Sequence, residues 1–406
     1  MRLKSIAAML LPAMLLAACI NNNNSKGTVA PPPVVNILTV TVDGGPAAAP
    51  GAINQAYVTV KVCVPGSQSQ CTNVDHVLLD TGSFGLRLVR SVLDAGMVAL
   101  AAKTDAQGLT IEECVHFGGG ETWGPVALAD VTMAGESAAN VPVQIMDDTA
   151  AGAPPPANCV SGALINDVAG FGANGVLGVG VFAQDCGPAC VSATTPLPLY
   201  YGCTSAGTCT AENIALASQV TNPVVLFASD NNGIIVNLPN LINANGDSSV
   251  QGELIFGLST QTDNPLPATG LTVLGADSNG DFTAKYNGTV LPALIDSGTG
   301  SYAFDDPAIT VCTSGSFVGY YCPAMAPQPG SAVNTGVGAN NAVNTVNFAI
   351  ADPNTFVPNA AAFTNLGGGR GSTTFTWGMP FFYGRKIYIG IEQRAAGSVT
   401  GPFYAY

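Results

Sequence analysis

Short segments in which apolar and polar residues alternate recur along most of the chain. The first two are residues 36–42 (Asn-Ile-Leu-Thr-Val-Thr-Val) and 56–62 (Ala-Tyr-Val-Thr-Val-Lys-Val). A period of two is typical of β-strands. The 48 Gly and 28 Pro residues suit the turns between many short strands. The best helix candidate is Leu88 to Ala102, and the pattern as a whole predicts a mostly β protein.

The chain also repeats a pair of signals in the same order. Residues 78–83 (Leu-Leu-Asp-Thr-Gly-Ser) recur as residues 294–299 (Leu-Ile-Asp-Ser-Gly-Thr). Residues 176–178 (Val-Leu-Gly) follow the first copy, and residues 376–378 (Thr-Trp-Gly) follow the second. We therefore expect two similar halves.

The N-terminus has the features of a targeting segment. Arg2 and Lys4 precede an apolar run from Ile6 to Ala18, which is shorter than a bilayer-spanning helix. Small residues before a cleavage point are typical of a secretory signal. A Cys at that point resembles a bacterial lipobox, which would make Cys19 the lipidated first residue; an ordinary signal peptide with an incidental Cys is the alternative.

These signals divide the chain into four expected parts. They are a signal peptide (1–18), a polar, Pro-ended linker attached to the lipid anchor (19–34), an N-terminal lobe (35–218) and a C-terminal lobe (219–406). We expect an exported lipoprotein of the cell envelope. Ile20 after Cys19, in place of Asp, favours the outer membrane if the cell has two membranes.

The charge of the chain excludes some partners. Its formal net charge is −14, and only 9% of its residues are charged. So acidic a chain repels nucleic acid and anionic membrane surfaces. We expect a monomer that binds no nucleic acid and meets a membrane through its lipid anchor only.

Ten cysteines remain after Cys19, and an even count in an exported protein predicts disulfides. Cys63 with Cys71 and Cys312 with Cys322 are close enough to bridge hairpins. Four cysteines are expected to pair among themselves, namely Cys186, Cys190, Cys203 and Cys209. Elimination leaves Cys114 with Cys159. A zinc site is the rival interpretation, and export favours disulfides over it.

The two Asp-Thr/Ser-Gly tripeptides carry the candidate chemistry. Asp80 and Asp296 each follow an apolar strand ending, before a turn on Gly82 or Gly298. If the two loops meet, two carboxylates share one water and hold one proton between them. One carboxylate then acts as general base, and the protonated one polarises a carbonyl group.

The neighbouring hydroxyl residues are expected to support these two carboxylates. Thr81 and Ser297 are placed to hydrogen-bond across the two loops. Ser83 and Thr299 are placed to bond the carboxylate of their own loop.

At these residues the sequence resembles the pepsin-like aspartic protease family. That family carries a hydrophobic-hydrophobic-Asp-Ser/Thr-Gly-Ser/Thr motif in each lobe, with a hydrophobic-hydrophobic-Gly strand downstream. The segments 174–180, 252–257 and 377–391 look like further strands of that family, so the likeness runs in order from residue 75 to residue 392. The resemblance implies a bilobal fold with two similar β-barrel-like lobes and a cleft between them.

The family also has a hairpin flap over its cleft, and residues 115–124 fit that place. The resemblance puts Phe117, Gly118 and Gly119 at the flap tip. The family usually has Tyr where Phe117 stands, and a Trp near the place of Arg87. Without the Tyr hydroxyl, and with a run of glycines, we expect a mobile flap.

Other motifs in the sequence give weaker evidence of a function. His76 and His116 lack a nucleophile context for serine hydrolysis, and no Gly-x-Ser-x-Gly elbow is present. Residues 277–281 (Asp-Ser-Asn-Gly-Asp) look like a calcium loop but are expected to form a hairpin turn. Residues 367–371 (Gly-Gly-Gly-Arg-Gly) are expected to form a flexible surface loop. We expect no metal and no cofactor.

The function expected from the sequence is that of an exported aspartic endopeptidase, a hydrolase that cleaves peptides or unfolded proteins with a water activated by the Asp pair. The alternative is an envelope-anchored, non-catalytic binding protein that retains the pepsin-like fold.

The anchor gives a first test. Cys19→Ser should yield soluble or unprocessed protein, because no thiol remains to accept the lipid. Partitioning between detergent and water measures this outcome. A wild-type protein found wholly in the aqueous phase would rule the anchor out.

Overall fold

The computed structural model describes residues 36–96, 98–146, 153–243 and 245–406. Most of their regular structure is β-strand, so the predicted mostly β class is confirmed. The expected signal peptide, the linker and Cys19 lie outside the described residues. Among the residues that are described, no helix combines the length and the apolar character needed to cross a bilayer.

The largest sheet runs through both halves of the sequence. In spatial order its strands are β10 (Cys209–Ala211), β9 (Tyr200–Cys203), β5 (Thr110–Phe117), β6 (Gly120–Met133), β7 (Glu136–Met146), β4 (Phe84–Val89), β8 (Gly175–Val179), β3 (Cys71–Asp80), β2 (Ala56–Cys63), β1 (Ile37–Val42), β12 (Val250–Phe256), β11 (Gly233–Leu238), β21 (Arg385–Gly390), β24 (Phe403–Ala405) and β13 (Val273–Gly275).

Part of this sheet closes into a barrel. β6 also pairs with β2, so that β2, β3, β8, β4, β7 and β6 form a ring. Alternate residues of β6 explain the closure, because Ala129, Val131 and Met133 are buried in the core while the residues between them are half-buried. The barrel thereby removes the free edges that these strands would otherwise have.

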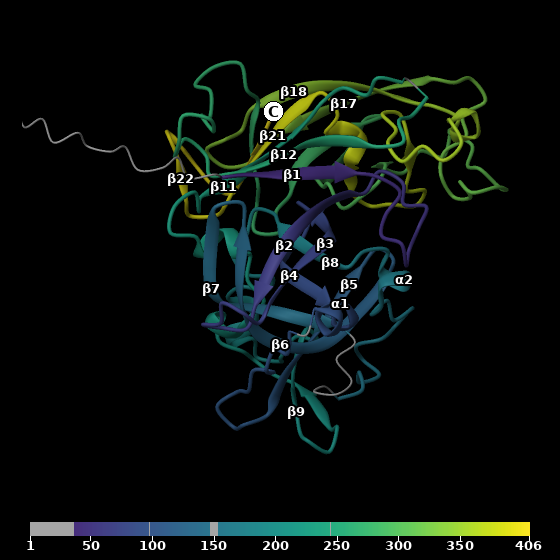
Figure 1. Ribbon diagram of the computed structural model, residues 1–406. Coiled ribbons are helices and arrows are strands. Elements are labelled where there is room, and N and C mark those ends of the chain that lie inside the picture. The colour runs from purple at the N-terminus through teal and green to yellow at the C-terminus, as the bar shows by residue number, and fades with distance from the viewer. Residues whose placement is uncertain (1–35, 97, 147–152, 244) are drawn as a thin grey trace, which may run out of the picture. The chain divides into compact units, whose positions relative to one another are not determined.

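β1 links the barrel to strands from the second half of the chain. Its six residues all pair with β12, from Ile37 opposite Ile255 to Val42 opposite Val250. It meets β2 only through Thr41 and Val42. Figure 1 shows β1 lying beside β12 and β11.

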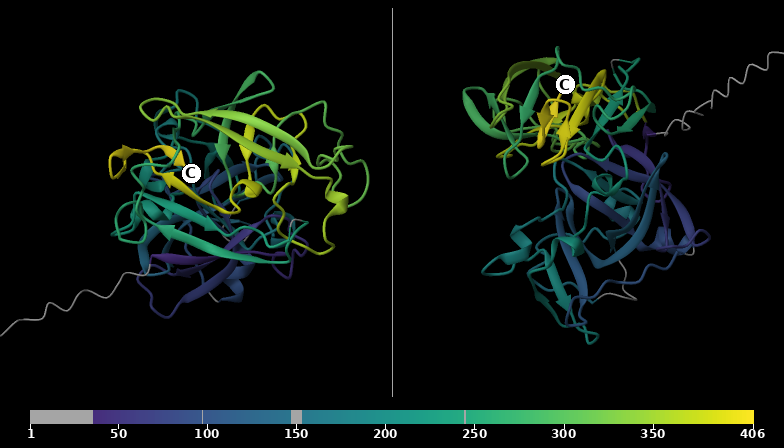
Figure 2. Two further views of the ribbon diagram at one scale, coloured as in Figure 1. Left: turned by 90° about the horizontal axis from the view of Figure 1, so that it is seen from above. Right: turned by 90° about the vertical axis from the view of Figure 1, so that its left-hand side faces the viewer.

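The second sheet lies wholly in the C-terminal half. Its spatial order is β18 (Val343–Ile350), β17 (Gln328–Thr335), β14 (Phe282–Tyr286), β15 (Thr289–Ile295), β20 (Phe375–Trp377), β16 (Tyr302–Ala303) and β19 (Gly367–Gly368). Figure 2 shows the long β17–β18 ribbon from two sides. A separate two-stranded sheet joins β22 (Ala395–Ala396) and β23 (Val399–Thr400).

Packed aromatic rings stabilise this second sheet. The cluster consists of Tyr286, Tyr302, Phe304, Phe348, Phe375 and Trp377. Trp377 is fully buried, and its indole N–H donates to Asn334 over 3.1 Å. Aromatic pairs with this spacing stabilise a core beyond the area they bury.

The repeated sequence signals correspond to a repeated strand arrangement. β3, which ends at Asp80, pairs in parallel with β8, and β8 pairs antiparallel with β4. β15, which ends just before Asp296, pairs in parallel with β20, and β20 pairs antiparallel with β16. Each half thus has three strands of the same relative directions around its Asp loop.

The helix predicted from Leu88 to Ala102 is wrong over most of its length. Leu88 belongs to β4, and among the described residues of this range only α1 (Arg90–Ala95) is helical. Leu86, Leu88 and Val89 are almost fully buried between β8 and β7, so tertiary strand pairing overrides local helix propensity. The remaining helical turns are α2 (Val168–Phe171), α3 (Ala189–Ser192), η1 (Leu216–Ser218), η2 (Pro223–Leu226), η3 (Pro353–Thr355) and η4 (Met379–Phe381).

Two turn predictions are also corrected. Gly367 and Gly368 are not a surface loop but the buried strand β19, where a Cβ on Gly367 would meet the Ile350 side chain at 2.5 Å. Residues 277–281 form a turn closed by the Asp277 carboxylate, which accepts from the amides of Asn279 and Asp281. This turn joins β13 to β14, which belong to different sheets, and so it is not a hairpin turn.

All five predicted disulfides are present, and the four cysteines predicted to pair among themselves do so as Cys186–Cys190 and Cys203–Cys209. The bridges are Cys63–Cys71, Cys114–Cys159, Cys186–Cys190, Cys203–Cys209 and Cys312–Cys322. The zinc interpretation is thereby excluded for these thiols. Cys312 and Cys322 lie near Asp352, but as a disulfide they offer no thiolate to a metal.

The bridges should differ in their effect on stability. Cys114–Cys159 joins residues 45 positions apart, whereas Cys186–Cys190 joins residues 4 apart. Because a longer closed loop restricts the unfolded chain more, replacing both Cys114 and Cys159 by Ala should destabilise by about 2–5 kcal/mol. The matched Cys186→Ala/Cys190→Ala variant should lose less stability. Thermal unfolding measures both, and equal losses would contradict the loop-length argument.

Candidate active site

Asp80 and Asp296 each follow a strand that is fixed by a parallel neighbour. Asp80 is the last residue of β3 and lies opposite Gly178 of β8. The Asp296 amide donates to the carbonyl of Trp377, the last residue of β20, over 3.0 Å. The buried apolar strands thus deliver both carboxylates to equivalent places in the repeated arrangement.

Four reciprocal hydrogen bonds join the two Asp loops. The Thr81 hydroxyl donates to the Ile295 carbonyl (2.8 Å) and accepts from the Ser297 amide (3.0 Å). The Ser297 hydroxyl donates to the Leu79 carbonyl (2.6 Å) and accepts from the Thr81 amide (3.1 Å). Both side chains are fully buried. The cross-loop bonds expected from the sequence are present, and they fix one loop against the other.

Each carboxylate is also held by its own loop. Asp80 accepts from the Gly82 amide at 2.8 Å and from the Ser83 hydroxyl at 2.6 Å. Asp296 accepts from the Gly298 amide at 2.7 Å and from the Thr299 hydroxyl at 2.6 Å. The roles proposed for Ser83 and Thr299 therefore match the geometry. The two carboxylates have nearly identical surroundings.

The two glycines allow the carboxylates to meet. A Cβ on Gly82 would lie 2.6 Å from the Asp296 carboxyl carbon, and a Cβ on Gly298 would lie 2.8 Å from that of Asp80. These distances are too short for any side chain. Each glycine is therefore required by the close approach of the opposite carboxylate, in addition to the turn that the sequence predicted.

The second carboxyl group changes the protonation of the first, and the two are hereafter the Asp pair. Burial, the charge of Asp296 and a hydrogen bond to its carboxyl group together raise the pKa of Asp80 to about 8. The bonds from Ser83 and Gly82 oppose this shift. A proton held between two such carboxyl groups would belong to the pair as a whole.

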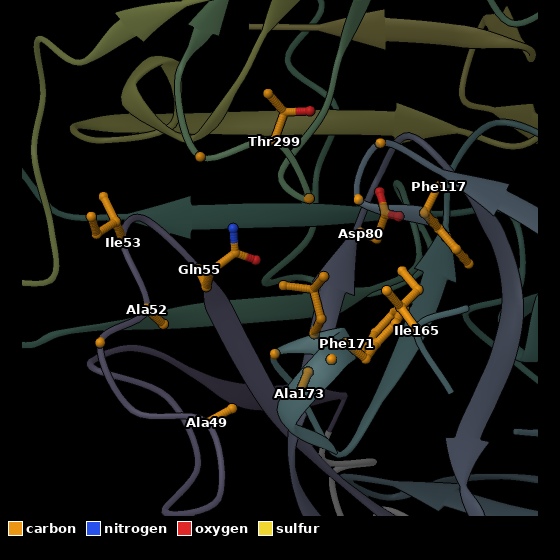
Figure 3. A pocket seen from close by; sticks show the side chains of 18 of the residues that line it. Ala49, Ala52, Ile53, Gln55, Asp80, Phe117, Ile165, Phe171, Ala173 and Thr299 are labelled. Carbon is orange, nitrogen blue, oxygen red and sulfur yellow. The ribbon is translucent and has the colours of Figure 1, made fainter. Parts of the chain in front are cut away.

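A cavity of about 790 Å³ lies over the Asp pair. Figure 3 shows Phe117, Ile165 and Phe171 close together on one part of its wall, away from Ala52 and Ile53. Among the described residues that line it, the Asp pair supplies the only carboxylates, and none is Lys, Arg or His. The cavity thus combines apolar walls with one acidic centre.

The predicted flap, residues 115–124, is a hairpin. β5 and β6 pair until Phe117 lies opposite Gly120, and Gly118 and Gly119 form the tip. Phe117, Gly118 and Gly119 all line the cavity. The Phe117 ring meets that of Phe171 edge-on, with centroids 5.5 Å apart.

Contacts behind the flap differ from the expectation of a weakly tethered hairpin. The Glu121 amide donates to the Ala163 carbonyl (2.9 Å), and the Ile165 amide donates to the Glu121 carbonyl (2.8 Å). The disulfide Cys114–Cys159 attaches β5 to the same segment. The base of the flap is therefore held by residues 159–165, while a Cβ on Gly118 at the tip would meet nothing within 4 Å.

Sequence reasoning missed the residues that complete the cavity. Ile165 and Phe171 come from the segment behind the flap, and Gln55 and Tyr320 come from opposite halves of the chain. None of them belongs to a local motif. Their role depends on the strand topology, which no short-range signal reveals.

The chain matches a protein family over most of its length. The family model described as "Protein of unknown function (DUF3443)" matches residues 32–406. The chain belongs to this family. A search of curated proteins returns no significant match. The family description leaves the chemistry to be inferred from the site itself.

The shared proton predicts how stability depends on pH. The pKa of Asp80 is higher in the folded state than in the unfolded chain, so folding becomes less favourable as pH rises from about 4 to about 8. Asp80→Asn removes the like-charge contact and should stabilise the protein at pH 7 by on the order of 1–4 kcal/mol, with little gain at pH 4.

Denaturant unfolding at both pH values measures this difference. Asp94→Asn is the matched control, because the Asp94 carboxylate is exposed and pairs with Arg90 on the surface. It should leave the pH dependence unchanged. A wild type and an Asp80→Asn variant with parallel pH profiles would contradict the shared proton.

Proposed function

We propose that this protein is an exported aspartic endopeptidase with the bilobal, pepsin-like fold. The observation that carries the proposal is the Asp pair, with each carboxylate held by its own loop and both loops joined by Thr81 and Ser297. The repeated strand arrangement around the two Asp loops supports two similar lobes with the cavity between them.

The arrangement suits general acid–base hydrolysis of an amide. A water between the carboxylates gives a proton to the ionised one as its oxygen attacks the peptide carbonyl carbon. The protonated carboxyl gives its proton to the carbonyl oxygen, and a tetrahedral diol forms. The pair then gives its proton to the amide nitrogen and takes a proton from one hydroxyl of the diol as the C–N bond breaks. The amine and the carboxylic acid leave, and the pair again holds one proton.

Burial and hydrogen bonding keep the pair in the form that this reaction needs. Burial and mutual repulsion favour retention of one proton. The hydroxyls of Ser83 and Thr299 and the amides of Gly82 and Gly298 stabilise the other carboxylate as an anion. Since the surroundings are nearly symmetric, either residue is able to serve as the base.

The cavity favours extended peptides with uncharged side chains. Phe117, Ile165 and Phe171 offer an apolar surface beside Asp80, which suits a large apolar side chain at the cleavage site. Acidic peptides are disfavoured by the Asp pair and by the net charge of −14. Unfolded protein segments fit these requirements.

The proposal includes a place in the cell envelope. Five disulfides support an oxidising compartment outside the cytoplasm. The N-terminal sequence up to Cys19 supports a lipid anchor, and the linker would hold a monomeric body away from the membrane.

The alternative of a non-catalytic, envelope-anchored binding protein rests on Phe117, which lacks the hydroxyl usual in the resembled family. The ring still covers the cavity and packs on Phe171. The complete set of hydrogen bonds around both carboxylates favours hydrolysis, because peptide binding alone does not require two buried acids to share a proton.

Mutation of the Asp pair tests the proposal. Wild-type protein should cleave a denatured, disulfide-free protein at acidic pH, and activity should fall as pH rises through about 8, where the pair loses its last proton. Asp80→Asn and Asp296→Asn should each lower kcat at least about 100-fold. Mass spectrometry of the products measures cleavage.

Asp94→Asn again serves as the control and should cleave at the wild-type rate. Cleavage by both Asn variants as fast as by wild type would overturn the mechanism. Peptide binding without cleavage, unchanged in the two variants, would instead favour the binding protein.

A further inference from the structure

A buried ionic cluster lies beneath the flap, outside the Asp pair. It consists of Arg87, Glu113, Asp185 and Tyr200, hereafter the Arg87 cluster. Arg87 is on β4, Glu113 is on β5 of the flap hairpin, and Tyr200 is on β9. Asp185 lies in the loop that follows β8. The flap strand β5 and three neighbouring segments therefore converge on one charged centre.

Arg87 contacts both the start of β4, directly after the first Asp loop, and the flap. Its guanidinium donates to the carbonyl of Phe84, the first residue of β4 and the neighbour of Ser83 (2.8 Å), and to the Glu113 carboxylate (2.7 Å). The same group lies 5.9 Å from the ring centroid of Phe117. Glu113 and Phe117 lie on the same face of β5, since side chains of a strand alternate.

The cluster is isolated from solvent, so its contacts are strong and specific. Arg87 is 1% exposed and Glu113 is fully buried. Breaking a buried ion pair leaves an uncompensated charge, which makes its geometry hard to change. The Glu113 backbone carbonyl also accepts from Gln144 of β7 (2.8 Å). The flap strand is thus fixed at Glu113 from two sides.

The charges of the cluster balance only if it retains a proton. One guanidinium faces two carboxylates, Glu113 and Asp185, and the titratable phenol of Tyr200 is the remaining group. Burial, followed by the negative charge of Glu113, raises the pKa of Asp185 well above its ordinary value. The Arg87 Nε and one Glu113 oxygen have no hydrogen-bond partner, so no further polar contact compensates the charges of the cluster at these two atoms.

We propose that Arg87 is a positioning residue that ties the flap to the Asp80 loop through Glu113, and that Asp185 completes the tie as its protonated, charge-balancing partner. The Arg87 cluster thereby fixes the distance between the Phe117 ring and the Asp pair. Raising the pH ionises Asp185, places two anions on one cation and loosens the flap. The effect on cleavage rests on the proposed function, whereas the effect on the flap does not.

Two isosteric variants form a matched test. Glu113→Gln and Asp185→Asn each remove one carboxylate and leave one for Arg87, so the two variants have the same formal net charge as each other. Only Glu113 belongs to the flap. Hydrogen exchange of the flap amides, expressed as protection factors corrected for intrinsic exchange rates, measures how firmly the flap is held. This measurement does not require catalysis.

Glu113→Gln should lower the protection of residues 118–121 by about tenfold or more, the size of one charge-assisted hydrogen bond. Asp185→Asn should keep wild-type protection at low pH and abolish its decline as pH rises. Arg87→Lys keeps the charge but not the fork of donors, so it should resemble Glu113→Gln. Protection of β17 and β18, far along the chain, should not change in any variant.

Cleavage kinetics supply the second readout. Glu113→Gln and Arg87→Lys should raise KM by about tenfold while kcat changes less, because the Asp pair is intact and only the flap is misplaced. Equal loss of flap protection in Glu113→Gln and Asp185→Asn, with no pH difference between them, would overturn the proposal and leave a merely structural cluster. If exchange follows the prediction in a protein without cleavage, the tie stands and the protease proposal fails.

Discussion

The exchange of hydrogen bonds between Thr81 and Ser297 is the constraint on which the rest of the site depends. Two buried carboxylates that face each other repel when both are ionised, so loops that were free would separate. The four bonds through these hydroxyls run between backbone groups of opposite loops, and they are wholly buried. They fix the separation of the carboxylates, which in turn requires glycine at 82 and 298 and a shared proton.

The same loop that carries Asp80 leads into β4 and so to Arg87. Glu113 of the flap hairpin accepts a hydrogen bond from Arg87 on β4, the strand that follows the first carboxylate. The disulfide Cys114–Cys159 attaches the same hairpin to the segment behind the flap. Contacts at the base thus hold a flap whose Phe117 has no hydroxyl to donate. A Cβ on Gly118 at the tip would meet nothing within 4 Å, while Phe117 lines the cavity.

The sequence was sufficient for features that depend on local chemistry. The Asp motifs, their hydroxyl partners and the disulfides follow from residue type, order and spacing, whereas the hairpin at residues 115–124 was expected from the resemblance to the pepsin-like family. The helix at Leu88 and the loop at Gly367 were wrong because buried strand pairing outweighs propensity and glycine content. The partners of Arg87 were also out of reach, because Glu113, Asp185 and Tyr200 meet only after four separate elements are in place.

In the proposed reaction the Asp pair acts on an oxygen placed between its carboxylates. Calorimetric titration with two matched peptides tests it most directly, one with a secondary alcohol in place of the scissile carbonyl and one with a methylene there. Wild-type protein should bind the alcohol at least about tenfold more tightly than the methylene peptide, and Asp80→Asn and Asp296→Asn should lose this preference. Equal affinity of wild-type protein for the two peptides would contradict it.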